Sequence, residues 1–187
     1  PKEQIGGDAQ FKYYGKKSLE FGISFRYFDE LVRDLGEVKR PQFEPYAFDQ
    51  YFYTRRIDPR AHLKFDMGRN HKFNSVTAFN LYDRVSENRR IDFENDSNYV
   101  LDDGQDTSKF TTLLNRTIVT AKYGNRWKAE YGLETQYETG AGDRIIDSSS
   151  TPINETRMMN IAGWVGAQYM PNERWTIQPS VRVGWNS

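Results

Sequence analysis

The 187-residue sequence contains no cysteine, which excludes disulfide bonds and zinc sites built on thiolates. It also has no apolar run long enough to form a transmembrane helix. Neither sign of charge is in excess, because 26 lysines and arginines match 26 aspartates and glutamates. The sequence therefore gives no reason to expect attraction to nucleic acid, and we expect no nucleic-acid partner.

Residues in the spacing of a catalytic or metal centre are also lacking, so we expect neither an enzyme nor a metal site. His62 lies among charged residues and His71 lies in a tight turn, which favours solvated histidines over metal ligands. Gly140-Ala141-Gly142 lacks the glycine spacing of a phosphate-binding loop. The acidic stretch Asp96 to Asp106 offers oxygen ligands of the kind calcium prefers, but without the spacing of an EF-hand. We therefore expect no cofactor and keep calcium in that stretch as the alternative.

Aromatic residues, by contrast, are abundant, at 15% of the chain. They begin and end the stretch Trp127 to Tyr137, in which apolar side chains at odd positions alternate with polar ones at even positions. A period of two indicates a strand with one apolar face and one polar face. Ten residues tilted by about 40–45° climb about 24 Å, close to the apolar band of an outer-membrane barrel, which aromatic girdles edge. Trp175 and Trp185 repeat the same ten-residue spacing.

The whole chain reads as about eight antiparallel strands without a helix, an all-β up-and-down fold. Short turns alternate with long polar loops, as in outer-membrane barrels. Pro59 cannot donate to a ladder, so we expect a bulge or break there. We also expect an acidic loop from Asn95 to Asp106 and another long loop from Leu31 to Gln50. The expected strands are Ala9–Tyr14, Leu19–Tyr27, Tyr51–Met67, Phe73–Phe93, Thr107–Tyr123, Trp127–Tyr137, Arg157–Met170 and Trp175–Asn186.

Alternation alone does not decide which face is wet, because a soluble barrel points its apolar face inward and a membrane barrel points it outward. The polar face is heavily charged: the strand from Tyr51 places Arg56, Asp58, Arg60 and His62 on it. The aromatic pairs at both strand ends favour the membrane interpretation. A soluble ligand-binding β-barrel remains the alternative.

The sequence resembles part of a TonB-dependent outer-membrane receptor, most like those of Bacteroidetes-type bacteria. The resemblance rests on several short sequence stretches that follow one another in a consistent order over most of the chain. Ser180 stands where the family often has glycine, a minor departure. The matching stretches are Tyr53–Asp58, Tyr131–Gln136, Gly140–Arg144, Gln178–Arg182 and the closing Asn186-Ser187.

This resemblance implies a 22-stranded transmembrane barrel in the bacterial outer membrane, closed inside by a plug. Such receptors bind a scarce nutrient, such as an iron chelate, haem or a cobalamin, and import it with energy passed from TonB. We expect residues 1–187 to form one partial barrel domain without the plug, an internal piece of such a receptor. Its partners would be outer-membrane lipid, a small nutrient ligand, and TonB through the plug. The alternative is a complete eight-stranded outer-membrane barrel with a structural or adhesive role.

Ligand contacts are expected on the polar face near the long loops. Arginine suits carboxylate-rich ligands, because its guanidinium makes two parallel hydrogen bonds. A lattice of arginines and carboxylates that neutralise each other is the structural alternative for every one of these residues. The predicted ligand-binding residues are Arg26, Arg56, Tyr82, Arg84 and Gln136.

Overall fold

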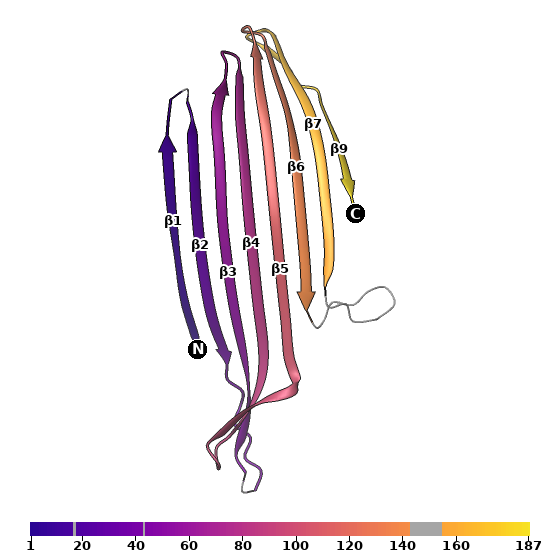
Figure 1. Cartoon of the computed structure of the whole chain (residues 1–187). Helices are drawn as coiled ribbons and strands as arrows, with labels where there is room; N and C mark the ends of the chain where they lie inside the picture. The colour runs from indigo at the N-terminus through magenta and orange to yellow at the C-terminus, as the bar shows by residue number, and fades with distance from the viewer. Residues whose placement is uncertain (17, 43, 143–154) are drawn as a thin grey trace.

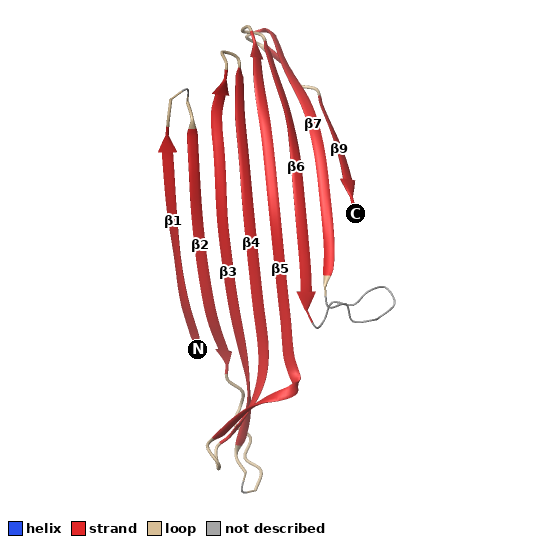
Figure 2. Cartoon of the chain, viewed as in Figure 1, coloured by secondary structure: helices blue, strands red, loops and turns tan. Residues whose placement is uncertain are grey.

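Every regular element of the protein is a β-strand in the computed structural model, which describes residues 1–16, 18–42, 44–142 and 155–187 (Figure 2). The strands form one antiparallel sheet in which β1 to β7 follow the order of the chain, and both β8 and β9 pair with β7. The predicted all-β up-and-down fold is therefore confirmed. The strands are β1 (Lys2–Tyr14), β2 (Glu20–Asp34), β3 (Tyr46–Met67), β4 (His71–Asp92), β5 (Ser97–Tyr123), β6 (Trp127–Gly142), β7 (Thr156–Asn172), β8 (Trp175–Ile177) and β9 (Ser180–Asn186).

The pairing register gives the sheet two chemically distinct faces. Even-numbered residues pair with even-numbered ones and odd with odd in the ladders between β1 and β7 and between β7 and β9, as in Phe21 with Leu63 and Leu63 with Ser75. In the ladders of the described residues, even residues pair with odd ones in two places. One is the β4–β5 ladder after the register shift at Glu87, and the other is the β7–β8 ladder after the shift at Tyr169. Because directly paired residues point to the same side, we call the two sides the odd face and the even face.

The odd face carries an apolar band with a sharp charged limit. On β3 the band runs from Ile57 to Met67, and ten residues at the tilt of a barrel strand climb about 24 Å. The next row toward the long loops is charged across the four strands β2 to β5. Its Arg55 and Asp83 form an ion pair of 3.0 Å between Nη2 and Oδ2. This row consists of Asp29, Arg55, Asp83 and Lys109.

The two ends of the sheet differ as predicted, with short turns at one end and the longest connections at the other. The boundaries of two predicted loops are wrong. The turns after β1, β3, β5 and β7 gather at one end, and the N-terminus lies toward the other (Figure 1). Two of these turns use glycines with positive φ, Gly68 and Gly124. The predicted acidic loop Asn95–Asp106 is wrong, because β4 and β5 are joined by residues 93–96 alone and β5 begins at Ser97. The predicted loop Leu31–Gln50 shortens to residues 35–45.

Two strand predictions need correction, and a third is confirmed. The first strand has 13 residues, from Lys2 to Tyr14, instead of about six. The expected bulge or break at Pro59 is a local break: the pairs at positions 58 and 59 are lost, and the β3–β4 register is the same on both sides. The predicted last strand is divided into β8 and β9 around Gln178 and Pro179. Because of the shift beside Tyr169, Trp185 lies in the same row as Thr135, through Ile161 of β7. It does not lie in the row of Tyr137, which is the next row of the same face.

The sheet is a single open layer among the described residues. In the described part of the chain, β1 pairs only with β2 and β9 pairs only with β7, so no ladder joins the first and last strands. No large side chain of the described part is fully buried; the buried apolar residues are four alanines, such as Ala78 and Ala121. Leu133 and Val181 on the odd face are 49% and 62% exposed, so neither lies in a dry core.

Candidate functional site

All five predicted ligand-binding residues lie on the even face, and the structure brings three of them together. Arg56 of β3 pairs directly with Tyr82 of β4, and Arg84 lies two residues further along β4, opposite Thr54. Arg26 of β2 lies opposite Asp58, in the next even row toward the short turns. Gln136 of β6 lies apart from this group, opposite Leu114 and Asn160.

Aromatic rings hold the guanidinium groups of the central arginines. The Arg56 guanidinium lies 5.9 Å from the ring centre of Phe28 on one side and 5.1 Å from that of Tyr82 on the other. These residues share one row of the sheet, and the row continues to Phe110, whose ring centre is 6.1 Å from that of Tyr82. The Arg84 guanidinium lies 4.9 Å from the ring centre of Phe52. Ring faces attract the cations and orient them without neutralising their charge.

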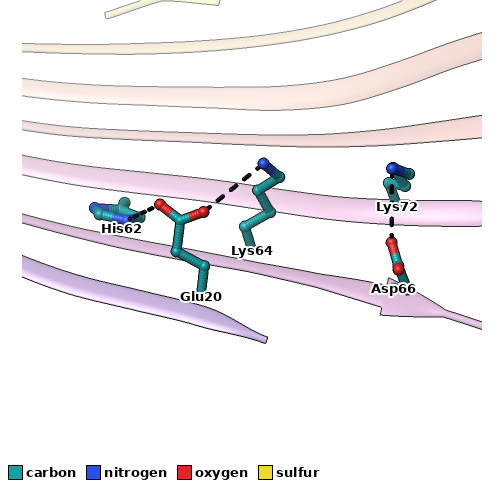
Figure 3. Close-up of polar contacts among 5 residues, drawn as sticks. All are labelled: Glu20, His62, Lys64, Asp66 and Lys72. Carbon is teal, nitrogen blue, oxygen red and sulfur yellow. Dashed lines mark hydrogen bonds and ion pairs between the residues drawn. The ribbon is translucent and has the colours of Figure 1, made fainter. Parts of the chain in front are cut away.

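Charge pairing divides the even face into two regions. Near the short turns, Glu20 contacts His62 at 3.1 Å and Lys64 at 3.8 Å, and Asp66 lies 4.0 Å from Lys72 (Figure 3). This region matches the self-neutralising lattice. Toward the long loops, no carboxylate of the described residues forms an ion pair with Arg26, Arg56, Arg60 or Arg84. We call these four residues the arginine cluster.

A second self-neutralising group lies on β5 to β9. Glu134 Oε1 accepts a hydrogen bond of 2.8 Å from Arg182, and its Oε2 lies 3.7 Å from Arg116 Nε. The Arg116 guanidinium also lies 5.2 Å from the Trp164 ring centre. In this group the arginines and the carboxylate are in direct contact, whereas Arg26 lies in the same row as Asp8 and Asp58 without an ion pair to either.

Shallow hollows in the even face coincide with the arginine cluster. One, of about 380 Å³, is lined by residues including Asp8, Ser24, Arg26, Asp58 and Arg60. Another, of about 330 Å³, is lined by Phe52, Arg84 and neighbours on β3 to β5. Gln136 lines a separate hollow of about 330 Å³ with Glu134 and Arg182. Gln136 also donates a hydrogen bond of 2.7 Å to Glu138, so its amide is already engaged.

Sequence reasoning left out several members of this site. Arg60 belongs to the cluster, and the rings of Phe28, Phe52 and Phe110 complete it. All four have even numbers, but the alternation placed only Arg60 on the polar face, and Phe28 lies beyond the expected strand Leu19–Tyr27. Their proximity depends on the register between neighbouring strands, which the alternation does not specify.

The described residues contain no candidate metal site, because no three histidine or acidic side chains among them come together. The stretch Asp96 to Asp106, considered for calcium, extends from the turn into β5, and the acidic side chains at 102 and 103 lie outside the described part. Within the described ranges, no helix has the length and apolar character needed to cross a membrane.

Comparison with known proteins gives a likeness of fold. No family model matches the sequence, and no curated protein matches it. Among solved structures, the chain is similar to the ferric citrate transporter FecA in its unliganded form, with a TM-score of 0.56 and 11% sequence identity. The match covers 97% of this chain and 27% of FecA, so the chain spans about a quarter of that transporter's length. The sheet thus has the fold of part of a β-barrel.

Proposed function

We propose that this chain is part of the wall of an outer-membrane nutrient-import barrel of the TonB-dependent type. The observation that carries the proposal is the contrast between its faces: an apolar band about 24 Å high on the odd face, and on the even face an arginine cluster that forms no ion pair among the described residues. In a membrane barrel the odd face contacts lipid and the even face lines the lumen. The likeness in fold to part of a transporter barrel supports the same arrangement.

The open edges of the sheet support a larger barrel over a small one. β1 and β9 each leave one edge without a partner strand among the described residues. In lipid, an unpaired strand edge costs several kcal/mol for each backbone group, so the edges require further strands. A complete eight-stranded adhesive barrel would need the ladder between first and last strands that is absent here. We propose that the strands which complete the barrel belong to a Bacteroidetes-type receptor, with a plug and TonB as partners.

The ligand best suited to the arginine cluster is an anionic nutrient complex, with a ferric chelate ahead of haem or a cobalamin. Guanidinium groups bind carboxylates through paired charge-assisted hydrogen bonds. Arg56 and Arg84 are oriented by rings and carry no ion pair in the described part of the chain, so their donors remain available. Their position toward the long loops would place them on the side from which a nutrient enters.

Substitution of these arginines in the full-length protein tests the proposal. Arg56→Gln and Arg84→Gln should each weaken binding of a ferric carboxylate chelate about 10-fold or more, because a charge-assisted hydrogen bond contributes about 1.5–3 kcal/mol. Lys64→Gln, on the same face but paired with Glu20, is the matched control and should change binding little. Binding is measured by titration with radiolabelled ferric citrate. Equal binding by all three variants and the parent would contradict the proposed site.

A further inference from the structure

A polar cluster interrupts the apolar band of the odd face at its middle depth. Ser75 pairs with Thr117, and Thr77 pairs with Asn115, across β4 and β5 at the centre of the sheet (Figure 1). The rows on either side are apolar, with Phe73 and Val119 toward the short turns, and Phe79 and Leu113 toward the long loops. We call Ser75, Thr77, Asn115 and Thr117 the amide–hydroxyl cluster. Lipid tails offer such groups no hydrogen bonds.

Hydrogen bonds connect the cluster into a closed circuit. The Asn115 amide nitrogen donates to Thr77 Oγ1 at 2.8 Å and to Ser75 Oγ at 3.4 Å. Ser75 and Thr117 share a hydrogen bond of 2.9 Å, and Thr117 Oγ1 donates to Asn115 Oδ1 at 3.2 Å. Since Thr117 uses its proton on Asn115, the proton between the two hydroxyls comes from Ser75. Both amide protons and two of the hydroxyl protons are thereby used inside the cluster.

After these hydrogen bonds, hydroxyl donors and an amide acceptor remain available along one row of the odd face. Within the described residues, the Thr77 hydroxyl proton meets no acceptor, and Asn115 Oδ1 accepts only one of the two hydrogen bonds it can take. Thr135 of β6 pairs with Asn115 and extends the row, with a hydroxyl that makes no hydrogen bond to the described chain. The row Thr77–Asn115–Thr135 therefore has a hydroxyl on each side of the Asn115 amide group, one of them hydrogen-bonded to it.

We propose that this row is the centre of a two-fold interface with a second copy of the same chain in the membrane, an inference that rests on the proposed function. A two-fold axis through Asn115 places Thr77 of each copy opposite Thr135 of the other, and each row supplies both donors and acceptors. Such an interface is self-complementary, as two-fold contacts require.

Cysteine cross-linking in the full-length protein, reconstituted in phospholipid vesicles, tests the interface. This chain has no cysteine of its own, so Asn115→Cys introduces one thiol on the proposed axis. Ile23→Cys is the matched control, because Ile23 lies in the same paired row and at the same depth, but three strands away on β2. Mild oxidation should convert most of the Asn115→Cys protein, and little of the Ile23→Cys protein, to a disulfide-linked dimer.

A second variant separates association from the cross-link itself. The double variant Thr77→Val, Thr135→Val, added to Asn115→Cys, removes the Thr77 and Thr135 hydroxyls with little change in volume and should reduce dimer yield at least 5-fold. Equal cross-linking at positions 115 and 23, a linkage only to a different protein in native membranes, or a monomeric protein would each overturn the inference. A protein that does not insert into the vesicles would instead contradict the proposed function.

Discussion

At the scale of single residues, Gly132 shows how the even face accommodates a large ring. A Cβ at Gly132 would collide with the ring of Trp164, which pairs with it from β7, and would lie 2.7 Å from the carbonyl oxygen of Thr117. The absence of a side chain therefore lets the Trp164 ring lie across β6, where Arg116 covers it. Alternation predicts that Trp164 is on the even face, but the β6–β7 register that sets it beside Gly132 depends on the connection between those strands.

Adding one methyl group at Gly132 should destabilise the sheet. We predict that Gly132→Ala lowers the free energy of unfolding by about 1–3 kcal/mol, the range for overpacked sites. Gly163→Ala is the control, because a Cβ there would meet nothing nearer than an oxygen at 3.8 Å. Chemical denaturation of the full-length protein, followed by tryptophan fluorescence, measures both. Equal stability of the two variants would contradict the packing described for Trp164.

Arg26, Arg56, Tyr82 and Arg84 show how far the candidate site could be predicted from sequence. The period of two was sufficient to place all four on one face toward the long loops. It could not show that Arg56 lies between two rings while Gln136 lines a different hollow, because these relations come from neighbouring strands. The sequence also could not separate self-neutralised arginines, such as Arg182, from those that form no ion pair within the described residues.

At the scale of elements, β3, β4 and β5 extend well past the charged row that ends the apolar band. Their far ends project beyond the ends of β1, β6 and β7 (Figure 1). In this region the alternation of apolar and polar residues is lost, and in the proposed arrangement this extension lies outside the lipid. The stretch Asn95–Asp106 was therefore predicted to be a loop. In the structure, β5 starts at Ser97 and pairs with the end of β4 through a register shift.

The turn at the tip of this extension is held by one carboxylate. Asp92 Oδ1 accepts hydrogen bonds from the backbone N–H groups of Glu94, at 2.9 Å, and Asn95, at 3.3 Å. Its Oδ2 accepts a third, of 3.1 Å, from the Asn95 amide group. The hydrogen bond from the Asn95 side chain, and those from the backbone after it, lower the pKa of Asp92 from its ordinary value.

This lowered pKa predicts how the turn responds to acid. The hydrogen bonds stabilise the turn fully above the pKa of an unfolded aspartate, about 3.9, and their contribution is lost as the pH falls through the lower folded pKa. The amide proton shifts of Glu94 and Asn95, followed by NMR in isotope-labelled protein, should titrate with a midpoint below 3.9. Asp92→Asn should abolish this titration. A midpoint at or above 3.9 would show that Asp92 does not hold the turn.

At the scale of the whole molecule, one parity of residue numbers orders most of the sheet. Tight turns and long strands keep even residues on one face and odd residues on the other over seven successive strands. A slip of one residue in any ladder would turn that strand's charged side chains, such as Glu134 on β6, onto the apolar face. The fold class could therefore be predicted from local alternation. The division of the last strand around Pro179 is a local feature that alternation could not specify.

The central claim is that the odd face contacts lipid and the even face contacts water, and nitroxide spin labels test it most directly. Labels are placed singly at Leu133 and Val181 on the odd face, and at Glu134 and Arg182, their neighbours on the even face. In the full-length protein reconstituted in vesicles, oxygen dissolved in lipid should relax the first pair, and an aqueous nickel complex should relax the second pair. Equal access of the nickel complex to all four labels, or protection of Leu133 and Val181 from both reagents, would contradict the account.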